Sequence, residues 1–172
     1  MLGHFLEFGI GTDDIAAAYA AFQSLGFTPV TPGDMRSEGY AVVSDGEAYF
    51  GLYDDGDDGA RLTFVRPDLA HYVRALRRQA IEIEFAHLGD QQFHELGFSD
   101  PDGQRVTLVE ARTFSPIVAE QCAQSVCGRL LEFSIAVRSL DSSRAFWSGL
   151  GFEPIAAGDE SRAWSGIRPA RA

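Results

Sequence analysis

The sequence predicts an α+β fold built from units with the order strand, helix, strand, strand, strand. Three observations lead to this prediction: an internal repeat, a change from strand-like to helix-like apolar spacing within each unit, and turn signals where hairpins should close. The repeat appears when residues 6–34 are compared with residues 131–159 without gaps. Eleven positions are identical, namely Leu6, Glu7, Phe8, Ile10, Ala20, Leu25, Gly26, Phe27, Pro29, Gly33 and Asp34. This agreement indicates a duplication.

The first unit is expected to occupy residues 1–56. Apolar residues alternate with other residues over positions 6–10, which is typical of a half-buried strand whose second face carries Glu7. A helix should follow over residues 13–26, because an aspartate can cap its start, apolar residues recur at helical spacing and a glycine can end it. Residues 40–54 then predict a hairpin that turns at an Asp-Gly pair.

A second, divergent unit is expected over residues 60–112. Residues 60–67 predict a strand, and residues 68–79 predict a helix with one apolar side. Three further strands should follow, with the last two joined by the turn sequence DPDG at residues 100–103. The second unit therefore repeats the order of the first.

The rest of the chain divides into a linker and the start of a third unit. Residues 113–128 show no clear periodicity and are expected to be a linker. Residues 129–172 begin with the duplicated strand and helix, followed by too few residues for three further strands. We therefore expect a complete two-unit domain over residues 1–112 and the truncated start of a second domain.

The amino-acid composition and net charge disfavour several classes of binding partner. The formal net charge of −11 disfavours binding to nucleic acid and to anionic membranes, because both repel an acidic surface. No apolar run is long enough to span a bilayer, and the first residues lack a signal-peptide pattern. The two cysteines, Cys122 and Cys127, are too few for a disulfide scaffold. These features predict a cytoplasmic protein.

Three motifs together resemble those of the vicinal-oxygen-chelate superfamily. They are the tandem units, the helix that opens with Asp14-Ile15 and closes with Ser24-Leu25-Gly26-Phe27, and the segment from Phe98 to Glu110 around DPDG. The superfamily includes glyoxalase I, bleomycin- and fosfomycin-resistance proteins and extradiol dioxygenases. The resemblance implies that paired units form a curled mixed sheet around a cavity, with the helices on the convex face.

The resemblance also implies four positions for metal ligands, one on the first and one on the last strand of each unit. In this sequence they hold Glu7, Gly51 (or Tyr53), Arg61 (or Leu62) and Thr107. Only Glu7 remains at a family ligand position as a metal-binding residue, and an arginine repels a cation. We therefore expect no metal at this site and no other cofactor. A Glu7–Arg61 ion pair in place of the metal, or an Arg61 that holds an anionic ligand, is the hypothesis that follows.

Other inward-facing positions complete the predicted site. Glu95 shares a face of its strand with Phe93 and Gly97, opposite the face that is expected to pack under a helix. It joins Glu7 as a candidate catalytic residue. Aromatic and neutral polar side chains suit a flat or amphipathic small molecule. The candidate ligand-binding residues are Glu7, Tyr49, Tyr53, Arg61, Thr63, Arg105 and Thr107.

Three functions remain open from the sequence. The first is a metal-free small-molecule-binding protein of the bleomycin-resistance type. The second is a lyase, isomerase or dioxygenase with an atypical Zn, Ni, Mn or Fe site that uses Glu7. The third is a structural or regulatory dimer with a filled cavity. A homodimer is expected in any case, because the lone strand and helix of the third unit bury little surface and should dock on a second chain.

Overall fold

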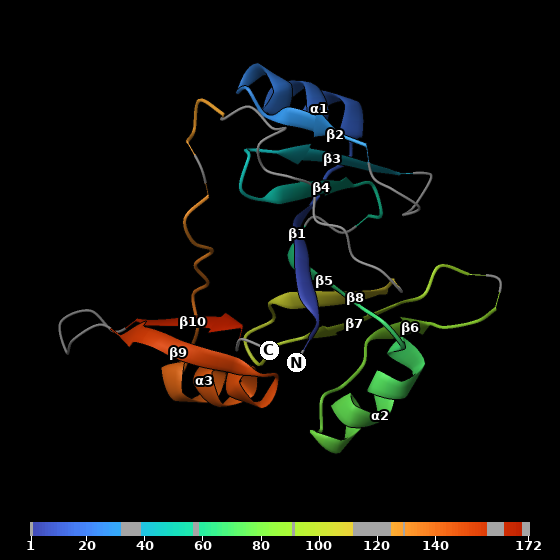
Figure 1. Cartoon of the computed structure of the whole chain (residues 1–172), viewed down its shortest axis with the longest axis vertical. Coiled ribbons are helices and arrows are strands. Elements are labelled where there is room, and N and C mark those ends of the chain that lie inside the picture. The colour runs from blue at the N-terminus through green and yellow to red at the C-terminus, as the bar shows by residue number, and fades with distance from the viewer. Residues whose placement is uncertain are drawn as a thin grey trace.

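The protein is built around one strongly curled, mixed sheet of eight strands, in the order β2-β3-β4-β1-β5-β8-β7-β6 (Figure 1). Its architecture comes from a computed structural model. The model describes residues 2–31, 39–56, 59–90, 92–111, 125–128, 130–157 and 164–169.

The first unit has the expected order. Its elements are β1 (His4–Gly11), α1 (Ile15–Ser24), β2 (Thr28–Val30), β3 (Tyr40–Ser44) and β4 (Tyr49–Tyr53). The side chain of Asp14 caps α1 by accepting a hydrogen bond from the backbone N–H of Ala17, which satisfies one of the free N–H groups at the helix start. Asp45 holds the β3–β4 turn in the same way, through the backbone N–H groups of Glu47 and Ala48.

The second unit repeats this order. Its elements are β5 (Ala60–Arg66), α2 (Leu69–Arg78), β6 (Phe85–His87), β7 (Glu95–Ser99) and β8 (Arg105–Glu110). The predicted apolar side of α2 is buried, and Asp68 caps this helix. The β6 strand has only three residues. It lies at the edge of the sheet, where only one neighbour is available to pair with it.

The two units join at the centre of the sheet through antiparallel pairing of their first strands. Phe8 pairs with Leu62, and the two positions are equivalent, since each lies six residues before the aspartate that caps the following helix. The units are thus related by a pseudo-twofold axis that passes near this pair. Residues at equal distances on either side of the axis face one another, so that Glu7 lies opposite Thr63.

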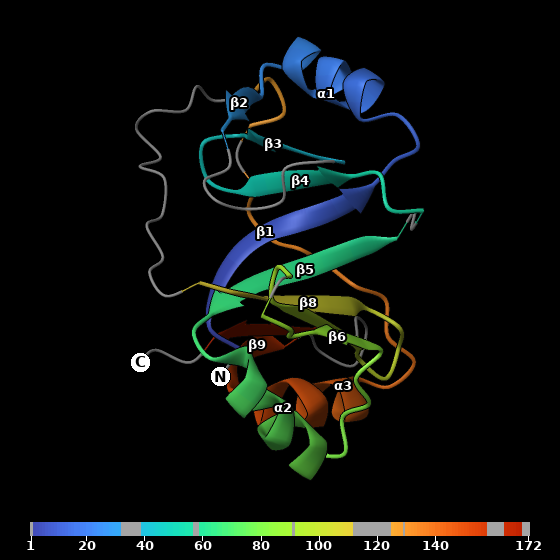
Figure 2. The ribbon, with the colours of Figure 1, turned by 90° about the vertical axis from the view of Figure 1, so that its right-hand side faces the viewer.

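The three helices of the described residues pack on the same face of the sheet, and none of them lies on the opposite face (Figure 2). Under α1, the ring of Phe22 stacks on Phe50, which contacts Phe8 of β1. Under α2, the core contains side chains from β5, β7 and β8. The apolar face of β1 thus packs toward α1 through Phe8 and Phe50.

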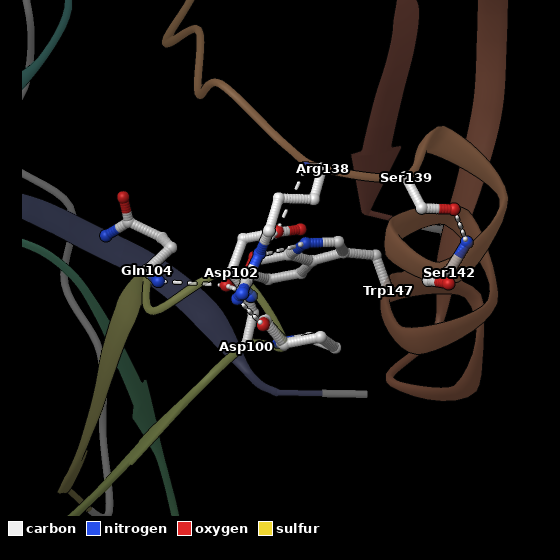
Figure 3. Close-up of polar contacts among 8 residues, drawn as sticks. Asp100, Asp102, Gln104, Arg138, Ser139, Ser142 and Trp147 are labelled. Carbon is white, nitrogen blue, oxygen red and sulfur yellow. Dashed lines mark hydrogen bonds and ion pairs between the residues drawn. The ribbon is translucent and has the colours of Figure 1, made fainter.

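The third helix, α3 (Leu140–Gly149), lies beside α2 and completes that core with Trp147 and Leu150. The turn at residues 100–103 holds this helix in place, as Figure 3 shows. The Trp147 indole N–H donates to the Asp100 carboxylate at 3.3 Å, and Arg138 binds Asp102 at 3.0 Å. The turn therefore anchors a segment far away in the sequence, besides closing a hairpin.

The predicted strand at the start of the third unit is wrong for residues 130–137, which form no strand. Their first copy, β1, has a neighbour on each side, whereas no described strand lies beside residues 130–137 to supply a ladder. Two strands that we did not expect, β9 (Phe152–Ala157) and β10 (Ser165–Pro169), form a separate hairpin next to α3. Most of the predicted linker, namely residues 113–124, lies outside the described residues.

The predicted fold class is confirmed: the chain forms a curled mixed α+β sheet with helices on its outer face. The proposed domain boundaries stay a prediction. Within the described ranges, no helix is long and apolar enough to cross a membrane.

Candidate functional site

The helix-free face of the sheet, here called the inner face, brings most of the predicted site residues together. Strand register places them, because paired residues share a face and residues two apart on one strand do so too. The inner-face residues are Glu7 and Gly9 of β1, Gly51 and Tyr53 of β4, Arg61 and Thr63 of β5, Glu95 and Gly97 of β7, and Arg105 and Thr107 of β8.

Glu7 is the buried charge at the centre of this face, with 1% of its surface exposed. Its two carboxylate oxygens accept hydrogen bonds from two tyrosine hydroxyls: Tyr40 Oη donates to Oε2 at 2.5 Å, and Tyr53 Oη donates to Oε1. Such charge-assisted bonds compensate for the removal of the carboxylate from water. The carboxylate lies over Gly51, where an added Cβ would come within 2.6 Å of Oε1. A glycine is therefore needed at Gly51 to leave room for the carboxylate of Glu7.

Arg61 is the second buried charge of the inner face. Its guanidinium forms a bidentate pair with the Asp55 carboxylate, at 2.6 and 3.0 Å, and lies 4.5 Å from the centre of the Tyr53 ring. The side chain crosses Gly9, where a Cβ would meet Arg61 Cγ at 2.4 Å. Both partners, the carboxylate and the aromatic face, favour the cation.

Tyr53 connects the two charges, since its hydroxyl binds Glu7 and its ring faces Arg61. Glu7 and Arg61 occupy equivalent positions in the two units, but they do not pair directly. Because β1 and β5 are antiparallel, Glu7 pairs with Thr63, and Arg61 is its diagonal neighbour two residues away on β5. Diagonal neighbours lie about 7–8 Å apart at their backbones. A direct Glu7–Arg61 ion pair stays a prediction.

Thr63 and Thr107 form the part of the inner face that offers neutral hydroxyls. Thr63 lies opposite Glu7 on one side and opposite Thr107 on the other. Thr63 is 1% exposed, and its Oγ1 is buried without a hydrogen-bond partner among the described residues. A buried hydroxyl without a partner costs about 1–3 kcal/mol, which a ligand or a water molecule would recover.

The electrostatics of this cluster favour a neutral phenol at Tyr40. Burial is the largest cause that raises the pKa of Tyr40 far above its ordinary value, and the negative charge of Glu7 is the second. The hydroxyl of Tyr40 therefore stays protonated and available to donate at any physiological pH.

Glu95 is held by a partner that the sequence did not reveal. Its Oε1 lies 3.1 Å from His87 Nδ1 on the neighbouring strand, and Glu95 is mostly buried whereas His87 is half exposed. The ring of Phe85 lies 5.5 Å from that of His87 and crosses Gly97. The side chains of Phe85 and His87 on the edge strand β6 thus form the border of the inner face.

The remaining predicted residues lie nearer the rim. Tyr49 is on the inner face of β4, opposite Ser44 of β3. Arg105 pairs in register with Arg61 and is exposed. It also lines a groove of about 440 Å³ between the turn at residues 102–104 and residues 133–136. The predicted residues therefore form a central cluster, around Glu7, and a looser rim.

Sequence reasoning missed three members of the cluster: Tyr40, Asp55 and His87. Tyr40 could have been found, because the turn at Asp45 fixes the hairpin register that pairs it with Tyr53. Asp55 and His87 belong to no motif that predicts a site residue. Their roles depend on contacts with Arg61 and Glu95, which no local pattern in the sequence shows.

The donors present do not fit the divalent metal that the fold family implies. Both oxygens of Glu7 accept tyrosine hydrogen bonds, its neighbours across the sheet are threonines, and Arg61 adds a positive charge. Among the described residues, no group of three or more His, Cys, Asp or Glu side chains could hold a metal ion. We derive no chemistry that depends on a metal.

Comparison with known proteins identifies the fold. No protein-family profile and no curated protein sequence matches the chain. A crystal structure of catechol 2,3-dioxygenase superposes with a TM-score of 0.56 and 13% sequence identity, over 95% of this chain and 61% of that one. The chain thus spans about three fifths of the length of that dioxygenase. The match shows that this chain has the fold of the vicinal-oxygen-chelate superfamily, as its motifs suggested.

Two further solved structures match less closely. Methylmalonyl-CoA epimerase from Mycobacterium tuberculosis is 21% identical, with a TM-score of 0.46, over 64% of this chain and 89% of that one. The Mn(II)-bound glyoxalase from Novosphingobium aromaticivorans is 15% identical, with a TM-score of 0.49, over 88% of this chain and 53% of that one.

Proposed function

We propose that this chain, which has the vicinal-oxygen-chelate fold, binds a small organic molecule on its inner face without a metal ion. The observation that carries the proposal is the buried Thr63 hydroxyl, which has no partner among the described residues and lies between Glu7 and Thr107. A folded chain keeps such a group at a cost in stability, and a ligand that accepts or donates one hydrogen bond removes that cost.

The surrounding side chains define the ligand. Tyr53 and Phe85 supply aromatic surface, Thr63 and Thr107 supply hydroxyls, and Arg61 supplies a positive charge that is already balanced by a carboxylate. An aromatic or amphipathic molecule with one carbonyl or hydroxyl group matches these properties. In this proposal the Glu7 side chain positions Tyr53, and it does not bind the ligand through a metal.

Ligand-dependent thermal stability tests the proposal. A panel of small aromatic carbonyl compounds should raise the melting temperature of the wild-type protein, because a ligand that binds only the folded state stabilises it. Thr63→Val keeps the side-chain volume and removes the hydroxyl, so the melting shift should disappear. Thr63→Ser keeps the hydroxyl and should retain it. A purified chain that carries one equivalent of Zn, Ni, Mn or Fe would overturn the metal-free site.

We also propose that the protein is a cytoplasmic homodimer with the domain organisation given above, residues 1–112 followed by a linker at 113–128 and a further unit. The free, exposed thiol of Cys127 supports a reducing compartment. The exposed apolar side chains of the further unit support the dimer, and they include Leu131 at 94% and Ile155 at 56% exposure. Sedimentation of the purified chain at several concentrations measures the assembly state.

A further inference from the structure

Residues 131–137 are the one copy of the duplicated strand sequence that lies unpaired among the described residues. None of them makes a backbone hydrogen bond to another described residue. Leu131 is 94% exposed and Phe133 is 40% exposed, although both belong to an alternating apolar pattern. The segment passes from the region of α1 to α3 along one side of the molecule (Figure 1).

Both ends of this segment are nevertheless fixed. At one end the backbone N–H of Leu130 donates to the Asp45 carboxylate at 2.6 Å. At the other end the backbone N–H of Arg138 donates to the Asp102 carboxylate at 3.0 Å. The chain therefore holds residues 131–137 at its surface, and their backbone groups bond to no other described backbone group. These groups can pair with another strand without the loss of any backbone hydrogen bond seen among the described residues.

The first copy of the same sequence shows what kind of partner it takes. β1 pairs in antiparallel fashion with β5, which is the first strand of another unit. The pairing is symmetric, because the equivalent residues Phe8 and Leu62 lie opposite one another. A first strand in this fold thus pairs with another first strand about a twofold axis. Phe133 is the counterpart of Phe8 in the repeat.

We propose that residues 131–137 of two chains pair as antiparallel strands about a twofold axis at Phe133, in the register of β1 and β5. This proposal rests on the homodimer proposed above and names its interface. Phe133 would face the partner's Phe133, as Phe8 faces Leu62. Glu132 would face the partner's Ser134, as Glu7 faces Thr63, so the two glutamates do not oppose each other.

A second copy of this chain explains the segment better than an unrelated partner does. Only a strand of the same sequence offers equal residues about a symmetry axis, and closed twofold pairing uses up both free edges at once. The contact between the Phe133 and Phe8 rings, with centroids 5.1 Å apart, also holds the centre of the segment on the body of its own chain. The symmetric pairing would thus bring the two chains together at the middle of this segment, where Phe133 contacts Phe8 of its own chain.

Cysteine cross-linking tests the register. In a background where Cys122 and Cys127 are replaced by serine, Phe133→Cys should form a disulfide-linked dimer on mild oxidation. Residues opposite one another in antiparallel strands have Cα atoms about 4.5–5.5 Å apart, within disulfide range. Leu131→Cys is the matched control, since its counterpart in the partner lies about 13 Å away in this register. The double variant Leu131→Cys with Ile135→Cys should cross-link.

A backbone variant separates the strand pairing from the packing of Phe133. Ser134→Pro combined with Ile135→Pro removes two N–H groups that bond to no described residue, so the far-UV circular dichroism of the folded chain should stay the same while the dimer dissociates. A dimer that cross-links equally through Leu131→Cys, or that survives the prolines, overturns this pairing and leaves the dimer intact. A monomeric wild-type chain overturns both.

Discussion

The hydroxyl of Tyr53 donates a hydrogen bond to the buried carboxylate of Glu7, while the ring of the same tyrosine faces Arg61. One side chain therefore hydrogen-bonds a carboxylate and contacts a guanidinium on the same face of the sheet. The arrangement occupies Glu7, which would otherwise be the residue most suited to bind a metal at this site. Its energetic consequences can be measured through stability.

Tyr53→Phe should lower the free energy of unfolding by about 2 kcal/mol. The substitution keeps the ring under Arg61 but removes a hydrogen bond to a charged group and leaves one carboxylate oxygen buried without it. Urea denaturation measures the change. Tyr19→Phe on α1 is the matched control and should change stability by less than about 0.5 kcal/mol. Equal losses from the two substitutions would contradict the role of the Tyr53 hydroxyl.

Glu7→Gln should destabilise the chain by about 1–3 kcal/mol, because an amide can accept a hydrogen bond from only one of the two tyrosine hydroxyls. The duplication supplies the control. Glu132 is the counterpart of Glu7 in the repeat but is exposed, so Glu132→Gln should have almost no effect on unfolding. If both substitutions were neutral, the inner-face cluster would contribute nothing measurable to stability.

Stability should fall at alkaline pH, and Tyr40 should contribute to the fall. Burial and the charge of Glu7 raise the pKa of Tyr40 in the folded chain above its unfolded value of about 10. A group with a raised pKa stabilises the folded state fully below its unfolded pKa, and this contribution is lost as the pH rises above that value. Urea unfolding at about pH 8 and about pH 11 measures the loss. The loss of unfolding free energy between these two pH values should be smaller in Tyr40→Phe than in the wild-type chain.

Tyr40→Phe should still lose some stability at alkaline pH, since burial also raises the pKa of Tyr72. An unchanged pH dependence in Tyr40→Phe would show that the Tyr40 hydroxyl does not titrate differently in the folded and unfolded chains.

Trp147→Phe should destabilise the protein by about 2 kcal/mol through a smaller ring and the loss of the bond from its indole N–H to Asp100. Trp164 is 48% exposed, so Trp164→Phe should change stability little. Fluorescence-monitored unfolding measures both variants, because each retains one tryptophan. A neutral Trp147→Phe would mean that α3 adds no stability to the α2 core.

Local patterns in the sequence were enough for most elements of the fold. The alternation around Phe8 predicted β1, an aspartate predicted the start of α1, and DPDG predicted a turn. Each of these depends on residues close together in the chain. The prediction of a strand at residues 130–137 was wrong because the alternation of apolar residues is a local pattern, whereas a strand also needs a neighbouring strand to pair with.

The sequence by itself determined the repeated units, the fold class and the presence of Glu7 on the face away from the helices. The tertiary structure alone decided what Glu7 contacts. The pairing of β1 with β5 placed Thr63 opposite it, the β3–β4 hairpin brought Tyr40 and Tyr53 to its carboxylate, and Asp55 took the charge of Arg61. These contacts join residues far apart in the chain, and a slip of one residue in strand register would turn every side chain to the other face.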